Sequence, residues 1–328
     1  MTRSDDYLWD RSGEDPEAAR LEALLAPLAH RAPLDELRMR RPRRSRAPIY
    51  VAAGIAAALA VVVLWRVTSK DAATCAGSTG FTFTAQGGNV ACGAASVASG
   101  ELPVGTVLDT GAHTAELAIS TIGKAQLGAN TRVRLEHTSG NRHQLYLAQG
   151  HMHARVSAPP RIFAVSTPSA NVTDLGCEYT LDIDAAGAGW LDVITGKVEL
   201  ETEEHTIVVA PAGTRVRMLA GRKPGVPLSH RAGPEITAAL RDFEATSTAD
   251  ALARVLAAST IADVITVANL AVIVPADRKR TVLERLAALV APPQDLAIDE
   301  ALSDPALFEM WFDEAVLVHL GVAAAKTP

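Results

Sequence analysis

The sequence predicts an all-β domain, either a short β-solenoid or a sandwich, followed by an α-helical domain and preceded by one transmembrane helix. Three observations in the 328 residues lead to this prediction. Residues 49–64 carry no charge, residues 105–221 alternate apolar and polar side chains between glycines, and residues 234–322 change to helical periodicity. A sandwich and a solenoid share the period of two, so the alternation does not distinguish them.

An uncharged run predicts a membrane-spanning helix over residues 48–67. The run reads IYVAAGIAAALAVVVL from Ile49 to Leu64. Extended to Val67 it has about 19 residues, close to the ~20 that a helix needs to cross the hydrocarbon core of a bilayer. A cleaved signal peptide is the alternative, but its charged region would be unusually long and its apolar region longer than usual.

Positive charges flank this run unequally. Six arginines lie between residues 38 and 46, whereas Arg66 and Lys70 follow the run. The positive-inside rule therefore places residues 1–47 in the cytoplasm and the chain from about residue 68 onward outside it. Residues 1–47 hold ten basic and nine acidic residues, so the remaining 21 basic and 28 acidic residues give the rest a net charge of −7. That balance argues against nucleic acid or anionic lipid as the partner of the outer part.

The cytoplasmic tail contains one predicted amphipathic helix. Asp15 and Pro16 are suitable as N-cap and first helical residue, and four leucines then follow on one helical face. Because a lone helix of this length is marginal in water, something is expected to cover the leucine face. A protein partner is our interpretation, and the inner membrane leaflet is the alternative. The predicted partner-binding residues, with an upstream aromatic anchor, are Trp9, Leu21, Leu24, Leu25 and Leu28.

The alternating region consists of short segments that glycines separate. Residues 144–147, 179–183 and 215–218 are typical, with apolar side chains at every second position. A Gly/Ala/Ser-rich stretch over residues 68–104 precedes them, and we expect it to be a linker with a possible disulfide loop.

Four of these segments, taken in order, resemble the FecR domain, the extracytoplasmic part of a family of membrane-anchored anti-sigma regulators. They are LYLAQG at residues 145–150, FAVSTP at 163–168, LGCEY at 175–179 and VITGKV at 193–198. The resemblance covers about residues 105–220. Two features depart from the family pattern. Cys177 replaces the customary threonine, and the tail is about half as long as the anti-sigma region of the better-known members.

The resemblance implies a single-pass protein of the bacterial inner membrane, with a cytoplasmic N-terminus and most of the chain in the periplasm. The outer domains would then sense an envelope signal or bind an envelope or outer-membrane protein. The tail would restrain a cytoplasmic sigma factor until the signal arrives. An envelope scaffold or ligand-binding protein with no transcriptional role is the alternative.

The three cysteines differ in their expected roles. In an oxidising compartment an even pair forms a disulfide, and Cys75 with Cys92 is the natural pair because the two flank a loop of 16 residues. Closing such a loop stabilises the fold by about 3 kcal/mol in the chain-entropy estimate. Cys177 lies between a glycine turn and an alternating strand, which fits a small buried residue. A disulfide with one of the others and a reactive thiol are the alternatives, although Asp174 and Glu178 would raise the pKa of the thiol.

Histidines gather in the middle of the β region without a catalytic or metal-binding motif. His151 and His153 would share one face of a strand, and His137 and His143 precede them. A metal site needs three or four ligands with set geometry, so we expect histidines that face solvent. The sequence has no phosphate-binding glycine loop, no Gly-x-Ser-x-Gly elbow and no His-Glu-x-x-His. We therefore predict no enzymatic activity, no cofactor and no metal, with a metal-dependent or thiol enzyme as the weakest alternative.

Helical periodicity begins near Pro234. The candidate helices are residues 235–245, 248–258, 260–273, 277–290 and 304–320. Ser303 is the expected N-cap of the last helix and Gly321 its end. Short helices of this kind indicate an α-solenoid-like stack of pairs or a small bundle, and such modules usually bind protein. Its expected core includes Leu307, Phe308, Trp311 and Phe312, with an exposed docking patch formed by them as the alternative.

Overall fold

The computed structural model describes residues 20, 75, 79–201, 207–219 and 224–322. The predicted span over residues 48–67 and all five predicted partner-binding residues of the tail lie outside this part of the chain. Within the described residues, no helix combines the length and the apolarity needed to cross a membrane. The chain divides into two compact units, Met1–Val67 and Thr68–Pro328, and the strands and helices below all belong to the second.

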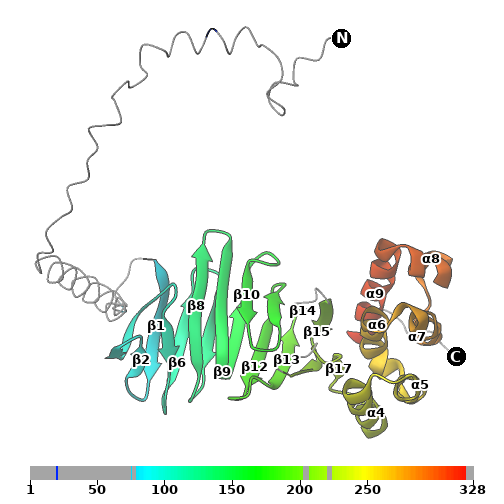
Figure 1. The fold of residues 1–328 in the computed structure, drawn as a ribbon, viewed down its shortest axis with the longest axis horizontal. Coiled ribbons are helices and arrows are strands. Elements are labelled where there is room, and N and C mark those ends of the chain that lie inside the picture. Colours follow the sequence, from blue (N-terminus) through cyan, green and yellow to red (C-terminus); the bar gives the residue numbers. More distant parts are fainter. Residues whose placement is uncertain (1–19, 21–74, 76–78, 202–206, 220–223, 323–328) are drawn as a thin grey trace, which may run out of the picture. The chain divides into compact units, whose positions relative to one another are not determined.

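The β region consists of two sheets, here named sheet A and sheet B (Figure 1). In spatial order, sheet A contains β4 (Ser99–Pro103), β1 (Gly80–Gln86), β6 (Thr114–Ile119), β7 (Gly123–Leu127), the second half of β9 (Arg142–Val156), β12 (Glu178–Ile183), β13 (Gly189–Thr195), β16 (Thr214–Met218) and β17 (Leu228–Ser229). Sheet B contains β3 (Ala95–Val97), β2 (Val90–Cys92), β5 (Val107–Asp109), β8 (Arg132–Ser139), the first half of β9, β10 (Phe163–Ser166), β11 (Asn171–Asp174), β14 (Lys197–Glu201) and β15 (Ile207–Pro211).

Successive hairpins alternate between the two sheets. The hairpins β10–β11 and β14–β15 lie in sheet B, whereas β12–β13 and β16–β17 lie in sheet A. Among the described strands, β9 and β10 are the one parallel pair. The region is therefore a two-layered sandwich whose chain passes back and forth between the layers, so it shares features of both architectures that the alternation predicts.

Strand β9 belongs to both sheets. Its first half pairs with β8 and β10 in sheet B, and its second half pairs with β7 and β12 in sheet A. The change occurs at Gly150, whose φ of +104° favours glycine over other residues. A Cβ atom there would also collide with the backbone of Thr131. Gly150 thus bends the strand where it leaves one layer and enters the other.

One apolar core lies between the two sheets. Sheet A contributes Leu117 and Leu181, and sheet B contributes Leu147 and Val172, all with no exposed surface. In β12 the sequence EYTLDI buries every second side chain, as the period of two requires. The two inner faces thus share a single hydrophobic cluster.

The β region begins earlier than the sequence analysis expects. Residues 80–103, assigned above to a linker, form β1 to β4. In β1, GFTFTAQ places Phe81 and Phe83 in the core and the intervening threonine outside. The surrounding glycines and small residues lower the apparent hydrophobicity of the stretch, although two buried aromatic side chains suffice to attach this strand.

The helical region follows the predicted pattern closely. Its helices are α4 (Pro234–Thr246), α5 (Ala249–Ala258), η3 (Ile261–Asp263), α6 (Val264–Ile273), α7 (Ala276–Leu289), η4 (Pro293–Asp295), α8 (Ile298–Ser303) and α9 (Pro305–His319). Two details differ from the prediction. Residues 298–303 form an additional short helix, and α9 is capped by Asp304, whose Oδ1 accepts a hydrogen bond from Ala306 N at 2.9 Å. Trp311 and Phe312 lie in the core of this region, as predicted, whereas Leu307 and Phe308 are only partly buried.

Buried polar contacts attach the helical region to the β region. β15 pairs with β14 on one side, and the backbone of Val209 faces α6 on the other. There Asn269 Oδ1 accepts from Val209 N at 2.9 Å, and Asn269 Nδ2 donates to Val209 O at 3.0 Å. Nearby, Thr266 Oγ1 donates to Pro227 O at 2.7 Å. Asn269 therefore satisfies the edge of sheet B in the way that another strand would.

Candidate functional site

A row of four side chains crosses the outer face of sheet A. Asp182 of β12 is the register partner of His151 on β9 and of Trp190 on β13, and Trp190 is the partner of Arg217 on β16. Their sequence neighbours Leu181 and Leu191 belong to the core, so the row residues project outward. Four strands thus bring together an imidazole, a carboxylate, an indole and a guanidinium.

Trp190 is unusually exposed for a tryptophan within a sheet, at 43 % of its surface. The guanidinium carbon of Arg215 lies 5.3 Å from the centre of its ring, within cation–π range. Arg215 is itself held by Asp192, whose Oδ1 lies 2.8 Å from Arg215 Nε and 2.9 Å from His230 Nε2. The hydrogen bond with Asp192 raises the pKa of Arg215. The indole is therefore fixed in place by a charged neighbour rather than by burial.

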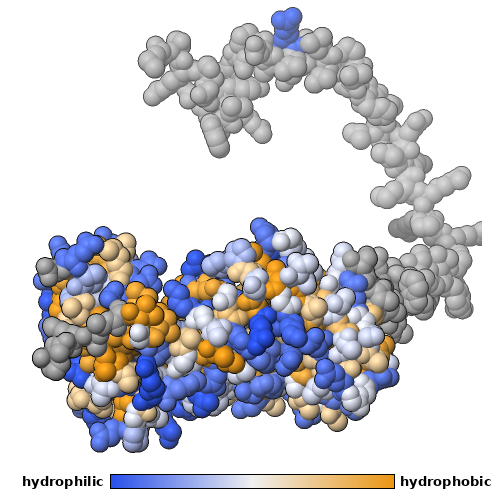
Figure 2. Space-filling model, turned by 180° about the vertical axis from the view of Figure 1, so that it is seen from behind, coloured by the Kyte–Doolittle hydropathy of each residue, from blue (hydrophilic) through white to orange (hydrophobic). Residues whose placement is uncertain are grey.

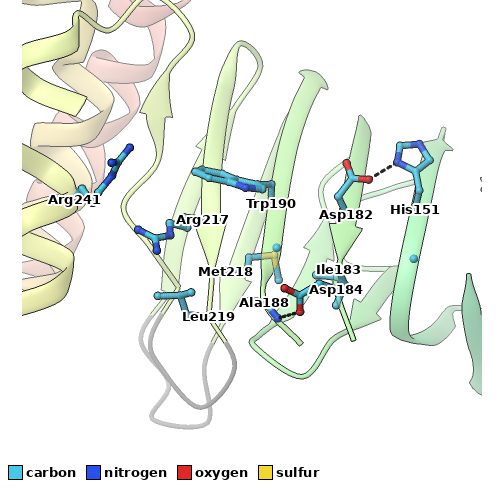
Figure 3. A pocket seen from close by; sticks show the side chains of 12 residues that line it. His151, Asp182, Ile183, Asp184, Ala188, Trp190, Arg217, Met218, Leu219 and Arg241 are labelled. Atoms are coloured by element: carbon cyan, nitrogen blue, oxygen red, sulfur yellow. Dashed lines mark hydrogen bonds and ion pairs between the residues drawn. The ribbon is translucent and has the colours of Figure 1, made fainter. Parts of the chain in front are cut away.

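Beside Trp190 an open cleft lies between sheet A and α4 (Figure 3). Its volume is about 790 Å³, and its lining includes Trp190, Arg217, Leu219 and Arg241. Arg241 comes from α4, so the cleft is formed jointly by the β region and the helical region. Figure 3 shows both guanidinium groups on the side of the indole away from His151.

The acidic side chains of the cleft are already engaged. Asp182 Oδ1 lies 2.7 Å from His151 Nδ1. Asp184 Oδ1 accepts from the backbone N–H groups of Ala186 and Ala188, at 2.8 and 2.9 Å, and so holds the β12–β13 turn. These carboxylates therefore serve contacts within the protein.

The arginines of the cleft are less well paired. Arg217 Nη1 lies 3.9 Å from Glu244 Oε2, and Glu244 also accepts a hydrogen bond from Val226 N. Burial raises the pKa of the Glu244 carboxyl, and the charges of Arg217 and Arg241 oppose this shift. Arg241 also acts on the Glu244 carboxyl through its charge, without a hydrogen bond to it among the described residues. The cleft therefore places two arginines, which share one carboxylate without a hydrogen bond to it, beside an aromatic ring.

The three cysteines occupy two different environments. Cys75 and Cys92 are joined in a disulfide, with Cα atoms 6.1 Å apart. Cys177 is free and buried, as the sequence interpretation expects, and its Sγ donates to Asp174 Oδ2 at 2.7 Å. Burial and the neighbouring Asp174 together raise the pKa of the Cys177 thiol far above its usual value. A thiol held in this protonated form is a poor nucleophile.

Comparison with known proteins identifies the middle of the β region. Residues 106–199 match the family model described as FecR protein. Residues 106–199 form a FecR domain. The FecR domain runs from β5 to the start of β14, so it supplies His151, Asp182 and Trp190 of the row. Arg217 and Arg241 lie beyond it.

Two crystal structures from Parabacteroides distasonis ATCC 8503, each provisionally described as an anti-sigma factor, are similar to the chain. The first is 16 % identical with a TM-score of 0.34, and the match covers 40 % of this chain and 63 % of that one. The second is 15 % identical with a TM-score of 0.27, and covers 48 % and 64 %. The chain thus spans less than two thirds of either structure. No curated protein matches the chain in sequence.

The histidines of the FecR domain do not converge. His153 Nε2 contacts Glu178 Oε1 at 2.8 Å, whereas His151 contacts Asp182. His143 is buried against Phe81, and its Nδ1 lies 2.8 Å from Thr138 Oγ1. No group of three or more metal-ligating side chains occurs within the described residues. Regulators of the FecR family are generally non-enzymatic.

Sequence reasoning missed the three residues that define the cleft. Trp190, Arg217 and Arg241 come from β13, β16 and α4, and no motif links them. The available signal was Trp190 itself, because its place before the buried Leu191 puts a large aromatic side chain on the wet face of a strand.

Proposed function

We propose that the chain is a single-span regulator of the FecR type. Residues 48–67 cross the bacterial inner membrane, residues 1–47 bind and restrain a sigma factor in the cytoplasm, and the β and helical regions receive a signal in the periplasm. The observation that carries this proposal is the FecR domain at residues 106–199, placed after an arginine-flanked apolar run and an amphipathic leucine pattern.

The disulfide supports the periplasmic placement. Disulfides such as Cys75–Cys92 persist in oxidising compartments and are rare in the bacterial cytoplasm. Cys75 follows the predicted span by eight residues, since the span ends at Val67. Both cysteines thus belong to the part of the chain that the positive-inside rule places outside the cytoplasm.

The joined β and helical regions support a role in signal reception. Three buried residues of the helical region, Asn269, Thr266 and His319, link the two regions through hydrogen bonds. A binding event on either region therefore acts on one continuous body. Release of a sigma factor additionally requires a change in the tail, for which proteolysis near the span is one route.

Two measurements on the full-length chain test the proposal. Co-purification from membranes of the source organism should recover a sigma factor with the wild type and lose it with Leu24→Asp/Leu28→Asp. Ala19→Asp/Ala23→Asp, on the opposite helical face, adds the same charge as a matched control and should retain the sigma factor. Accessibility to a membrane-impermeant label should place an N-terminal tag inside and a C-terminal tag outside.

A second candidate is an envelope ligand-binding protein with no transcriptional role. The cleft beside Trp190 favours it, because that site lies entirely in the outer part of the chain. If the wild type and both variants recover no sigma factor while the topology holds, this second function is the better description.

A further inference from the structure

The cleft between sheet A and α4 combines a fixed, exposed indole with incompletely paired arginines. From this we propose that the cleft binds a small organic anion in which an oxyanion, such as a carboxylate, lies next to a flat ring face. The ring would pack on Trp190, and the oxyanion would be held by Arg217 and Arg241.

The arginines define the charged half of the ligand. A guanidinium offers N–H donors in a planar fork that matches the two oxygens of a carboxylate. Arg241 interacts with the Glu244 carboxyl through charge alone, and Arg217 Nη1 lies 3.9 Å from Glu244 Oε2, beyond hydrogen-bond distance. Asp182 and Asp184 are occupied by His151 and by backbone amides, so they compete little for these guanidinium groups.

Trp190 defines the flat half of the ligand. An indole offers a large rigid surface at low conformational cost, and an aromatic ring or the apolar face of a sugar ring packs on it. Arg215 fixes the indole by a cation–π contact at 5.3 Å, so the surface is preorganised before the ligand arrives. Exposure of 43 % of the side chain leaves area for that contact.

The size and position of the cleft fit a small molecule. A volume of 790 Å³ lies within the range of about 300–1,000 Å³ that is typical of small-molecule sites, which also favour junctions between structural regions. Here the ring platform comes from the FecR domain, whereas both arginines come from the chain beyond it. Ligand binding therefore depends on how the helical region is attached.

Calorimetric titration of the full-length chain tests the proposal with defined probes. The anions 2-naphthoate and trigalacturonate represent an aromatic and a sugar ring, 2-naphthol removes the charge, and inorganic phosphate removes the ring. We expect at least one of the two ring-bearing anions to bind saturably, and to bind at least about tenfold more tightly than its uncharged or ringless counterpart. Which anion binds identifies the kind of ring.

Single substitutions test whether the anion binds in the cleft. Trp190→Ala and Arg241→Gln should each weaken the bound anion about tenfold or more, and Arg254→Gln, on the neighbouring helix α5, should leave it unchanged. A thermal melt of each variant confirms that it is folded. Absence of saturable binding by both anions at millimolar concentration would overturn the proposal, as would equal affinity in the wild type, Trp190→Ala and Arg241→Gln.

This test is separate from that of the regulatory function. Ligand binding is measured at the cleft, whereas sigma-factor capture is measured through the leucines of the tail. If the anion binds but no sigma factor is captured, the proposed ligand site stands and the proposed regulatory function is rejected. If a sigma factor is captured but no anion binds, the regulatory function stands and the proposed ligand site is rejected.

Discussion

The β region and the helical region are held in place by different kinds of contact. In the β region, two sheets share one apolar core, and the polar groups lie outside in cross-strand rows. The helical region has its own apolar core, but polar side chains such as Asn269 and His319 reach from it to the backbone of the β region. The reason is the sheet edge, because the backbone of β15 needs hydrogen-bond partners that aliphatic side chains do not supply.

The two kinds of contact have different effects: the apolar cores stabilise each region, and the hydrogen bonds attach one region to the other. Apolar packing is non-directional and holds each region together, whereas a hydrogen bond to one backbone N–H and its carbonyl fixes a particular placement. On this view the β region tolerates changes in the interface better than changes in its core. Four substitutions or conditions test this ordering.

The largest loss is expected from the shared core. Leu181→Ala removes a fully buried side chain between the sheets, and we expect it to lower the free energy of unfolding by about 4 kcal/mol. Chemical denaturation measures the change. Thr180→Ala, on the outer face of the same strand, is the control and should cost less than about 1 kcal/mol. Similar losses for both variants would show that β12 does not depend on this core.

The second largest loss of stability is expected from reduction of the disulfide. Reduction of Cys75–Cys92 opens the loop and should lower the free energy of unfolding by about 3 kcal/mol. Urea denaturation with and without reductant measures it, and Cys177→Ala should show the same difference because Cys177 is not part of the bond. An unfolding midpoint that does not respond to reductant would contradict the expectation.

A smaller loss should follow disruption of the attachment. Asn269→Leu leaves the N–H and carbonyl of Val209 without their partner, which should cost about 2 kcal/mol. Hydrogen exchange of β15 should accelerate in this variant while exchange in β12 stays unchanged. Asn141→Leu, at an exposed turn, is the control. Equal acceleration in β12 would mean that core and attachment are not separable.

The smallest loss of stability is expected from acidic pH. His319 Nε2 contacts Ala212 O at 3.0 Å, its Nδ1 is buried without a partner in the described structure, and burial lowers the pKa of this imidazole. Arg231 and His230 lower the pKa further. The unfolded chain therefore binds a proton more readily than the folded chain, so stability should be constant above about pH 7 and fall as the pH drops through the unfolded value of about 6.5.

Substitution measures that contribution. In His319→Gln, the part of the loss between about pH 7.5 and pH 5.5 that comes from this imidazole should disappear. Identical slopes in the wild type and His319→Gln would show that the imidazole does not sense acid at this interface.

The sequence predicts the helical region better than the β region for a physical reason. Helix ends depend on local signals such as Pro234 and Gly321, and most predicted boundaries agree with the structure within one or two residues. Strands depend on partners far along the chain. Alternation predicts that Leu181 is buried, but the pairing of β12 with β9 depends on register, which a single sequence does not reveal.

The same limit applies to the candidate site. Sequence reasoning gave the correct environment for Cys177, because a glycine turn followed by alternation is local information. It did not find the cleft, since Trp190, Arg217 and Arg241 become neighbours through sheet register and helix packing. The predicted residues of the tail lie outside the described part of the chain, so they stay predictions.

The bend at Gly150 makes the β region indivisible. Because β9 contributes its first half to one layer and its second half to the other, a fragment that ends before residue 142 leaves both layers with an open edge. Open edges recruit strands from other molecules and cause aggregation. Any shortened version of this protein should therefore keep β9 together with the strands on both sides of it. Protease cleavage within residues 142–156 should destabilise both sheets at once.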